Sequence, residues 1–96
     1  MKKYTPRDGK IVEYFFRKNG FPTAKLIGSL GRGKNSNNDI DILLPYAKNT
    51  LQLRQKLIYL LEPKKDFVDT DWGGLFFYDT FFGNVDIFFT TKDFDY

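Results

Sequence analysis

The sequence contains neither cysteine nor histidine. Without cysteine there can be no disulfide bond and no thiol nucleophile, and without histidine there can be no imidazole base. Zinc sites built from cysteine and histidine are excluded for the same reason. Any metal ion would have to be held by oxygen ligands, which favours a hard cation such as Mg²⁺, Mn²⁺ or Ca²⁺.

Long apolar runs are also missing. No stretch approaches the roughly 18 apolar residues that a membrane-spanning helix needs. Lys2 and Lys3 are not followed by the apolar segment of a signal peptide. We therefore expect a cytoplasmic protein that does not associate with membranes.

Apolar and aromatic residues are abundant. The chain has 96 residues, of which 42% are hydrophobic and 19% aromatic, with eleven phenylalanines. This composition supports a packed core and excludes a disordered tail. The length predicts a single domain over residues 1–96.

Charge is distributed unevenly around a net value of +3. Residues 1–64 carry 13 Lys and Arg against 5 Asp and Glu, whereas residues 65–96 carry 2 against 7. A basic first part suits a polyphosphate or nucleic-acid ligand, although a solvated surface of uneven composition explains the same pattern.

Two segments have the apolar spacing of a helix. The first follows the capping residue Thr5 and ends at Asn19-Gly20. The second contains the leucines between residues 53 and 61, with Asn49 as its expected cap and Glu62-Pro63 as its end.

Five segments are predicted to be strands, and Gly83-Asn84 is predicted to be the turn of a hairpin between the last two. Residues 30–38 form a turn-rich stretch with little to bury. The pattern predicts an α/β (α+β) fold, in which a mixed sheet of about five strands has two main helices packed on one face. The predicted strands are residues 24–27, 39–44, 66–70, 75–80 and 85–91.

Asp39-Ile40-Asp41 lies in the second of these strands. Side chains two residues apart in a strand point to the same face, so both carboxylates leave one face and Ile40 the other. Two carboxylates about 4 Å apart repel by about 4 kcal/mol at an effective dielectric of about 20. A folded protein tolerates such a pair if one acid is protonated, if water screens the charges, or if a cation bridges them.

Asp86 interrupts the apolar run of the last expected strand. Taken alone, it is expected at an edge or facing solvent, because burying an unpaired charge is costly. If its strand lies next to residues 39–44, Asp86 becomes a third oxygen ligand for the same cations.

Gly28-Ser29 opens a glycine-punctuated turn that also contains Arg32 and Lys34. Such a turn can present backbone N–H groups, a hydroxyl and basic side chains to a phosphate, although each feature also fits an ordinary turn with solvent-facing charges. Together with the three aspartates, the turn fits a two-metal site for in-line phosphoryl transfer, with a carboxylate in place of histidine as the proton acceptor.

The spacing of these motifs resembles the DNA polymerase beta nucleotidyltransferase superfamily. Gly28-Ser29 is followed by nine residues, then by Asp39-Ile40-Asp41, and later by the strand-borne Asp86. Residues 28–44 are especially similar to the palm of family X DNA polymerases. They are also similar to aminoglycoside nucleotidyltransferases and to minimal nucleotidyltransferases that pair with HEPN-domain proteins. The resemblance is specific over residues 28–41 and implies a palm-like core.

The resemblance also implies an activity. A nucleoside monophosphate would be transferred from a nucleoside triphosphate to a hydroxyl acceptor with release of pyrophosphate, and two Mg²⁺ or Mn²⁺ ions would serve as cofactors. By this resemblance, Asp39 and Asp41 bind both ions, and Asp86 completes the catalytic one.

The turn would hold the triphosphate. Ser29 would contact it, Gly28 and Gly33 would shape the turn, and Arg32 would face phosphate. Gly31 departs from the polymerase palms, in which a second basic residue is usual. The residues expected to bind the nucleotide are Gly28, Ser29, Arg32, Gly33 and Lys34.

Only ten residues follow Asp86, so the thumb and DNA-gripping domains of a polymerase are missing from this sequence. We expect a homodimer or a protein partner to complete the acceptor site. Two alternatives stay open. The chain could be an antitoxin-like subunit that binds or nucleotidylates a helical partner, or a minimal family X-like DNA polymerase. The low net charge and the lack of a helix-hairpin-helix element do not favour nucleic acid as a partner.

Overall fold

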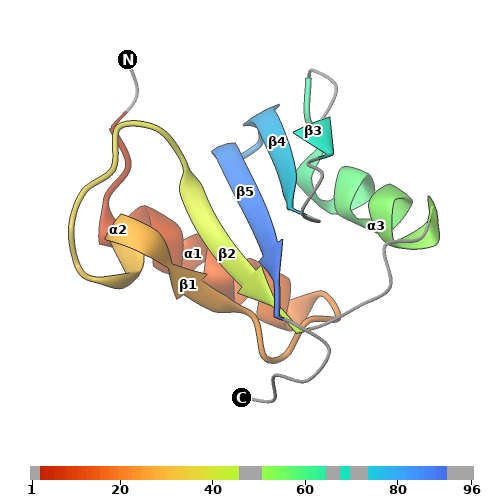
Figure 1. The fold of residues 1–96 in the computed structure, drawn as a ribbon, viewed down its shortest axis with the longest axis horizontal. Coiled ribbons are helices and arrows are strands. Elements are labelled where there is room, and N and C mark those ends of the chain that lie inside the picture. Colours follow the sequence, from red (N-terminus) through yellow and green to blue (C-terminus); the bar gives the residue numbers. More distant parts are fainter. Residues whose placement is uncertain (1–2, 46–50, 65–67, 70–73, 91–96) are drawn as a thin grey trace.

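The computed structural model describes residues 3–45, 51–64, 68–69 and 74–90 (Figure 1). The expected helix cap Asn49 and parts of two expected strands, residues 66–67, 70 and 91, lie outside the described residues. In chain order the elements are α1 (Pro6–Lys18), β1 (Lys25–Ile27), α2 (Gly28–Gly31), β2 (Ile40–Leu44), α3 (Leu51–Leu61), β3 (Val68–Asp69), β4 (Leu75–Thr80) and β5 (Gly83–Phe89).

The five strands form one mixed sheet in the order β1-β2-β5-β4-β3. β2 and β5 are parallel neighbours, and the other pairs are antiparallel. This arrangement confirms the predicted mixed α/β fold. It also places β5, from the C-terminal part of the chain, directly beside β2 at the centre of the sheet (Figure 1).

One face of the sheet is apolar and is covered by α1 and α3. Figure 1 shows α1 behind β1 and β2, with α3 beside β3 and β4. Buried side chains of both helices join the inward-facing strand residues in a single core, as predicted. Its fully buried members include Val12, Phe16, Ile40, Ile42, Leu44, Leu57, Leu61, Leu75, Phe77, Val85 and Ile87.

The start of α1 is formed by a capping box. The backbone N–H of Asp8 donates to the Thr5 hydroxyl (3.3 Å), and the backbone N–H of Thr5 donates to the Asp8 carboxylate (2.9 Å). This reciprocal pair satisfies two N–H groups at the helix start and confirms the predicted N-terminus. Gly9 in the first turns allows close packing, because a Cβ there would lie 2.7 Å from the side chain of Leu26 in β1.

The connection before β2 differs from the prediction. Gly28–Gly31 forms one helical turn, α2, and the paired part of the following strand begins at Ile40 rather than Asp39. Leu30 is buried in the core, so the expectation that residues 30–38 bury little is wrong at this position. Its apolar side chain draws this turn against the helix-covered face of the sheet.

The hairpin between β4 and β5 is confirmed, but its turn is not where it was predicted. Phe81 and Phe82 make the turn, and Gly83-Asn84 belong to β5. The Thr80 hydroxyl explains the shift, because it donates to the Gly83 carbonyl (2.6 Å) and accepts from the Phe82 N–H (3.0 Å). Phe82 packs on Phe15 of α1, whereas Phe81 is 78% exposed.

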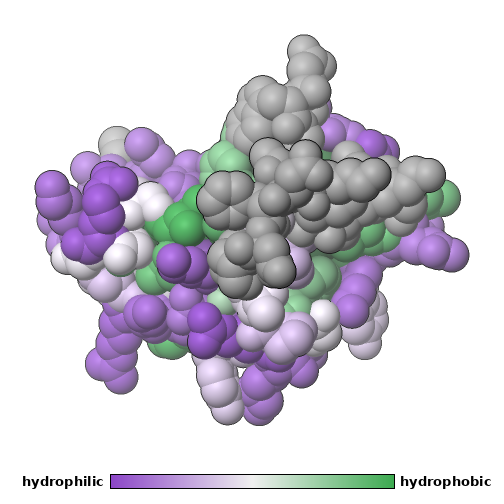
Figure 2. Space-filling model, turned by 60° about the horizontal axis from the view of Figure 1, so that its bottom comes forward, coloured by the Kyte–Doolittle hydropathy of each residue, from purple (hydrophilic) through white to green (hydrophobic). Residues whose placement is uncertain are grey.

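No helix in the described part of the chain is long and apolar enough to cross a membrane. On the face shown in Figure 2, hydrophilic side chains make up most of the described surface, with apolar side chains in smaller patches between them.

Candidate metal centre

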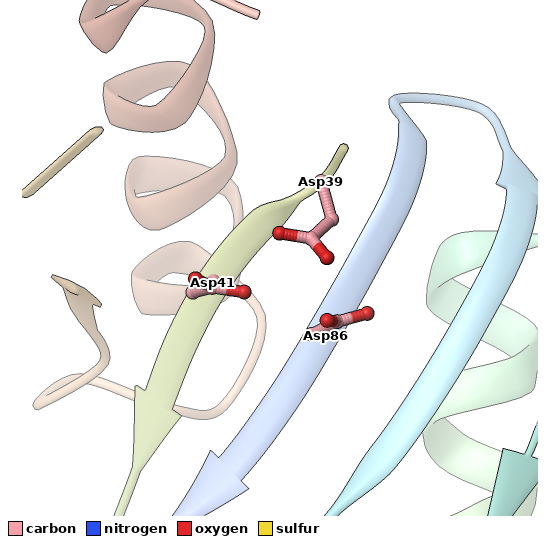
Figure 3. A group of neighbouring side chains, drawn as sticks. All are labelled: Asp39, Asp41 and Asp86. Atoms are coloured by element: carbon pink, nitrogen blue, oxygen red, sulfur yellow. The ribbon is translucent and has the colours of Figure 1, made fainter. Parts of the chain in front are cut away.

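The pairing of β2 with β5 brings three aspartates together. Asp41 and Asp86 are direct partners in the register of the two parallel strands, and Asp39 precedes β2 by one residue. The three side chains leave the same side of these strands and lie close together (Figure 3). One carboxylate oxygen from each lies within 4.8 Å of the other two. The condition set out above, that the strand of Asp86 lies next to residues 39–44, is therefore met.

The local sequence explains which way the acids point. Along β2 and β5, apolar residues on the core face alternate with Asp41 and Asp86 on the other face. Because Asp41 and Asp86 are partners in the register, the pleat turns both carboxylates to the same side. Asp39 precedes β2 by one residue, and its side chain lies on the same side (Figure 3).

The cluster is crowded with negative charge. Asp86 is only 8% exposed, and Asp39 and Asp41 are half-buried. Burial, the charge of Asp39 and a hydrogen bond with Asp39 raise the pKa of Asp41 to about 7. Burial, a hydrogen bond with Asp39 and the charges of Asp39 and Asp41 raise the pKa of Asp86 to about 8.

The charge balance around the three carboxylates indicates which kind of ligand they suit. Within the described part of the chain, none of the three aspartates forms an ion pair with Lys or Arg. A divalent cation would supply the neutralising charge, and carboxylate oxygens are the ligands that Mg²⁺ and Mn²⁺ prefer. The donor set and its spacing therefore fit a site for hard cations.

Gly28 lies directly against this cluster. Its φ of 71° belongs to the left-handed region, and a Cβ at this position would collide with the Asp41 carboxylate. Only glycine combines that backbone conformation with so close an approach. Gly28 thus shapes the turn, as expected, and also makes room for a candidate metal ligand.

The rest of the predicted phosphate turn is compact. The backbone N–H of Arg32 donates to the Gly28 carbonyl (3.2 Å), and that of Lys34 donates to the Ser29 carbonyl (2.9 Å). Ser29 is half-buried, and Gly33 has a φ of 82°. The side chains of Arg32 and Lys34 are exposed, and neither pairs with a carboxylate among the described residues. Contact of this turn with a triphosphate stays a prediction.

The structure explains why position 31 is a glycine. A Cβ at this position would lie 2.6 Å from the carbonyl oxygen of Leu26, a backbone atom that cannot rotate away. A basic side chain at position 31 would therefore require the backbone of α2 to shift away from β1.

One buried acid that supports the site was not singled out from the sequence. Glu13 in α1 accepts a hydrogen bond from the Leu26 N–H (2.7 Å) and lies near Lys10 (3.5 Å) and Arg17 (3.8 Å). Arg17 Nε also donates to the Ala24 carbonyl (2.8 Å). These contacts fix β1, and with it the start of α2, on α1. An acid beside the apolar stripe of an amphipathic helix was the available signal.

The function of this protein has to be inferred from the geometry of the site. No family model matches the chain, and no curated protein matches its sequence.

Proposed function

We propose that this protein is a nucleotidyltransferase that uses two Mg²⁺ or Mn²⁺ ions to transfer a nucleoside monophosphate from a nucleoside triphosphate to a hydroxyl. The observation that carries the proposal is the cluster of Asp39, Asp41 and Asp86 on neighbouring strands. Its place against Gly28, at the start of a turn with two exposed basic side chains, supports a phosphate-bearing substrate.

In this proposal the carboxylates hold the ions, Asp39 and Asp41 sharing both and Asp86 completing one. Bound ions supply charge neutralisation for the triphosphate and for the departing pyrophosphate. Ser29 and the basic side chains of Arg32 and Lys34 orient the phosphate chain on the other side of Gly28.

The transfer itself is a balanced displacement at phosphorus. The oxygen of the acceptor hydroxyl forms a bond to the α-phosphorus, while the bond from that phosphorus to the bridging oxygen of pyrophosphate breaks. The hydroxyl proton passes to a carboxylate of the cluster, because the chain has no histidine to accept it. Asp86 is the most buried of the three acids and is the acceptor that we assign.

Calorimetric titration with Mg-ATP, followed by the other three Mg-NTPs, tests the proposal. We expect Asp39→Asn and Asp41→Asn to weaken binding by at least about 100-fold, more than the loss of an outer-shell partner causes. Asp79→Asn is the matched control, because Asp79 lies outside the cluster and has a φ of 56° that asparagine adopts readily. Unchanged affinity in both cluster variants, with folding confirmed by circular dichroism, would refute the proposal.

Labelling identifies the acceptor. The protein is incubated with each radiolabelled NTP, Mg²⁺ and a lysate of the native source. A labelled protein, nucleic acid or small molecule, absent with Asp41→Asn, names the acceptor class. If wild type labels nothing while Mg-NTP still binds, the chain is a nucleotide-binding subunit rather than a transferase.

A further inference from the structure

We infer that Asn84 and Tyr4 are positioning residues that hold the loop of Asp39 against the strand of Asp86. This inference rests on the proposed function, since it concerns the same cation site. It starts from an asymmetry among the three acids. Asp41 and Asp86 lie within paired strands, whereas Asp39 precedes the first paired residue of β2.

On the loop side, the position of Asp39 depends on Ser36. The Ser36 hydroxyl accepts from the backbone N–H groups of Asn38 (3.3 Å) and Asp39 (3.4 Å). Ser36 is in turn paired with Tyr4 in both directions, through Tyr4 N–H to Ser36 carbonyl (2.7 Å) and Ser36 N–H to Tyr4 carbonyl (2.9 Å). The backbone just before the first metal ligand is thereby joined to the segment that precedes α1.

On the strand side, Asn84 lies two residues before Asp86. Its side-chain Nδ2 donates to the Asn38 carbonyl (3.2 Å), and its Oδ1 accepts from the Asp79 N–H (3.1 Å). Its backbone N–H donates to the Tyr4 hydroxyl (2.9 Å). Asn84 therefore links the residue before Asp39 to the strand that carries Asp86.

Tyr4 closes the connection. Its backbone holds Ser36, and its hydroxyl holds Asn84, so one buried residue joins both segments. Gly83 allows this placement, because it has a φ of 99° and a Cβ there would lie 2.8 Å from the tyrosine ring. Residues 31–38 contain no large apolar side chain that could anchor the loop instead.

The connection matters because cation sites demand accurate ligand placement. Mg²⁺ requires oxygen ligands at about 2.0–2.1 Å in near-octahedral arrangement, and Mn²⁺ also prefers octahedral oxygen sites. A loop that moves by an ångström takes Asp39 out of that arrangement while Asp41 and Asp86 stay in the sheet. Loss of the Asn84 link should thus weaken cation binding without abolishing the fold.

The experiment is a Mn²⁺ titration of the full chain by calorimetry and electron paramagnetic resonance. Asn84→Ala should weaken Mn²⁺ affinity by about tenfold, the lower end of what loss of a ligand-orienting residue costs. Tyr4→Phe, which keeps the ring and removes only the hydroxyl, should weaken it by a smaller factor. Thr80→Val is the matched control, because the Thr80 hydroxyl stabilises the same hairpin turn without contacting residues 36–39.

The number of Mn²⁺ ions bound per chain distinguishes a positioning role from a folding defect. A purely structural defect lowers the number of Mn²⁺ ions bound per chain, whereas a misplaced Asp39 lowers affinity at an unchanged number. Wild-type affinity in Asn84→Ala and Tyr4→Phe, with Mn²⁺ bound by wild type, would overturn this inference alone. Should Asn84→Ala fail to fold, Tyr4→Phe decides. No Mn²⁺ binding by wild type would overturn the proposed function as well.

Discussion

The two faces of the central strands β2 and β5 differ sharply, although their residues alternate along the same short segments. On the face toward α1 and α3, Ile40, Ile42 and Ile87 are at most 1% exposed. On the other face, Asp41 and Asp86 lie side by side with raised pKa values. The first face stabilises the fold through apolar burial, whereas the second opposes it through crowded charge. Adjacent residues on one strand thus contribute to stability with opposite sign.

The largest effect on stability is expected on the core face. Ile42→Ala should lower the free energy of unfolding by about 2–5 kcal/mol, because it leaves a cavity among fully buried side chains. The neighbouring Leu43→Ala, at a half-buried position on the other face, should cost clearly less. Urea denaturation of both variants measures the difference, and equal losses would contradict the contrast between the faces.

A smaller effect is expected where Gly28 meets the acidic face. Gly28→Ala adds about 1–2 kcal/mol of left-handed backbone strain and pushes the Asp41 carboxylate aside. Gly33→Ala has similar strain, but its Cβ would meet open space. We therefore expect Gly28→Ala to lower stability at least as much as Gly33→Ala, and only Gly28→Ala to weaken Mn²⁺ binding, by about tenfold. Equal Mn²⁺ affinity in the two variants would show that the placement of the Asp41 carboxylate does not depend on a glycine at position 28.

The acidic face should make stability depend on pH. The pKa values of Asp41 and Asp86 are raised on folding, so protonation of these groups favours the folded state. Their contribution to the free energy of unfolding is fully present below about pH 4 and is lost as the pH rises through about 7 and 8. In thermal unfolding without divalent cations, Asp86→Asn should raise the melting temperature by a few degrees at pH 8 and leave it unchanged at pH 4. Millimolar Mg²⁺ should stabilise wild type at pH 8 far more than at pH 5. Identical pH profiles of wild type and Asp86→Asn would rule out this role for Asp86.

The smallest effect is expected at Glu13, a buried acid that has partners. Glu13→Gln keeps an acceptor for the Leu26 N–H but loses the attraction to Lys10 and Arg17, both largely exposed cations. We expect a loss of at most about 1 kcal/mol, the usual range for such pairs. Glu13→Gln should thus lower stability, whereas Asp86→Asn should raise it at pH 8. Denaturation of both variants in the same buffer compares the two changes. A stabilising Glu13→Gln would show that its partners do not compensate the buried charge.

Local features of the sequence predicted most of the fold. The first helix follows from its cap and apolar stripe. The predicted bounds of β4 match the observed ones, because residues 75–78 form an apolar run after a glycine pair. The turn of the last hairpin was misplaced because Gly83-Asn84 has the composition of a turn. The Thr80 hydroxyl and the packing of Phe82 on Phe15, which decide the turn, involve contacts that composition does not reveal.

The candidate site was predicted in part for a similar reason. The shared face of Asp39 and Asp41 was predicted from strand geometry, and the turn at Gly28 was combined with the aspartates into one site from the motifs. The links through Tyr4 and Asn84 could not be predicted, since they join residues 80 positions apart by side chains common in any loop. Which serine or asparagine side chain forms a hydrogen bond depends on which distant segments the fold brings together.

The sequence by itself determined that any metal would be held by oxygen, because it has no cysteine or histidine, and that Asp39 and Asp41 would share a face, because strand side chains alternate. The tertiary structure decided that Asp86 joins them, since only the parallel pairing of β5 with β2 sets its register against Asp41. Alternation acts over two residues and can be seen in any short segment. Register between distant strands depends on the packing of the whole apolar face, and so it emerges only when the chain is folded.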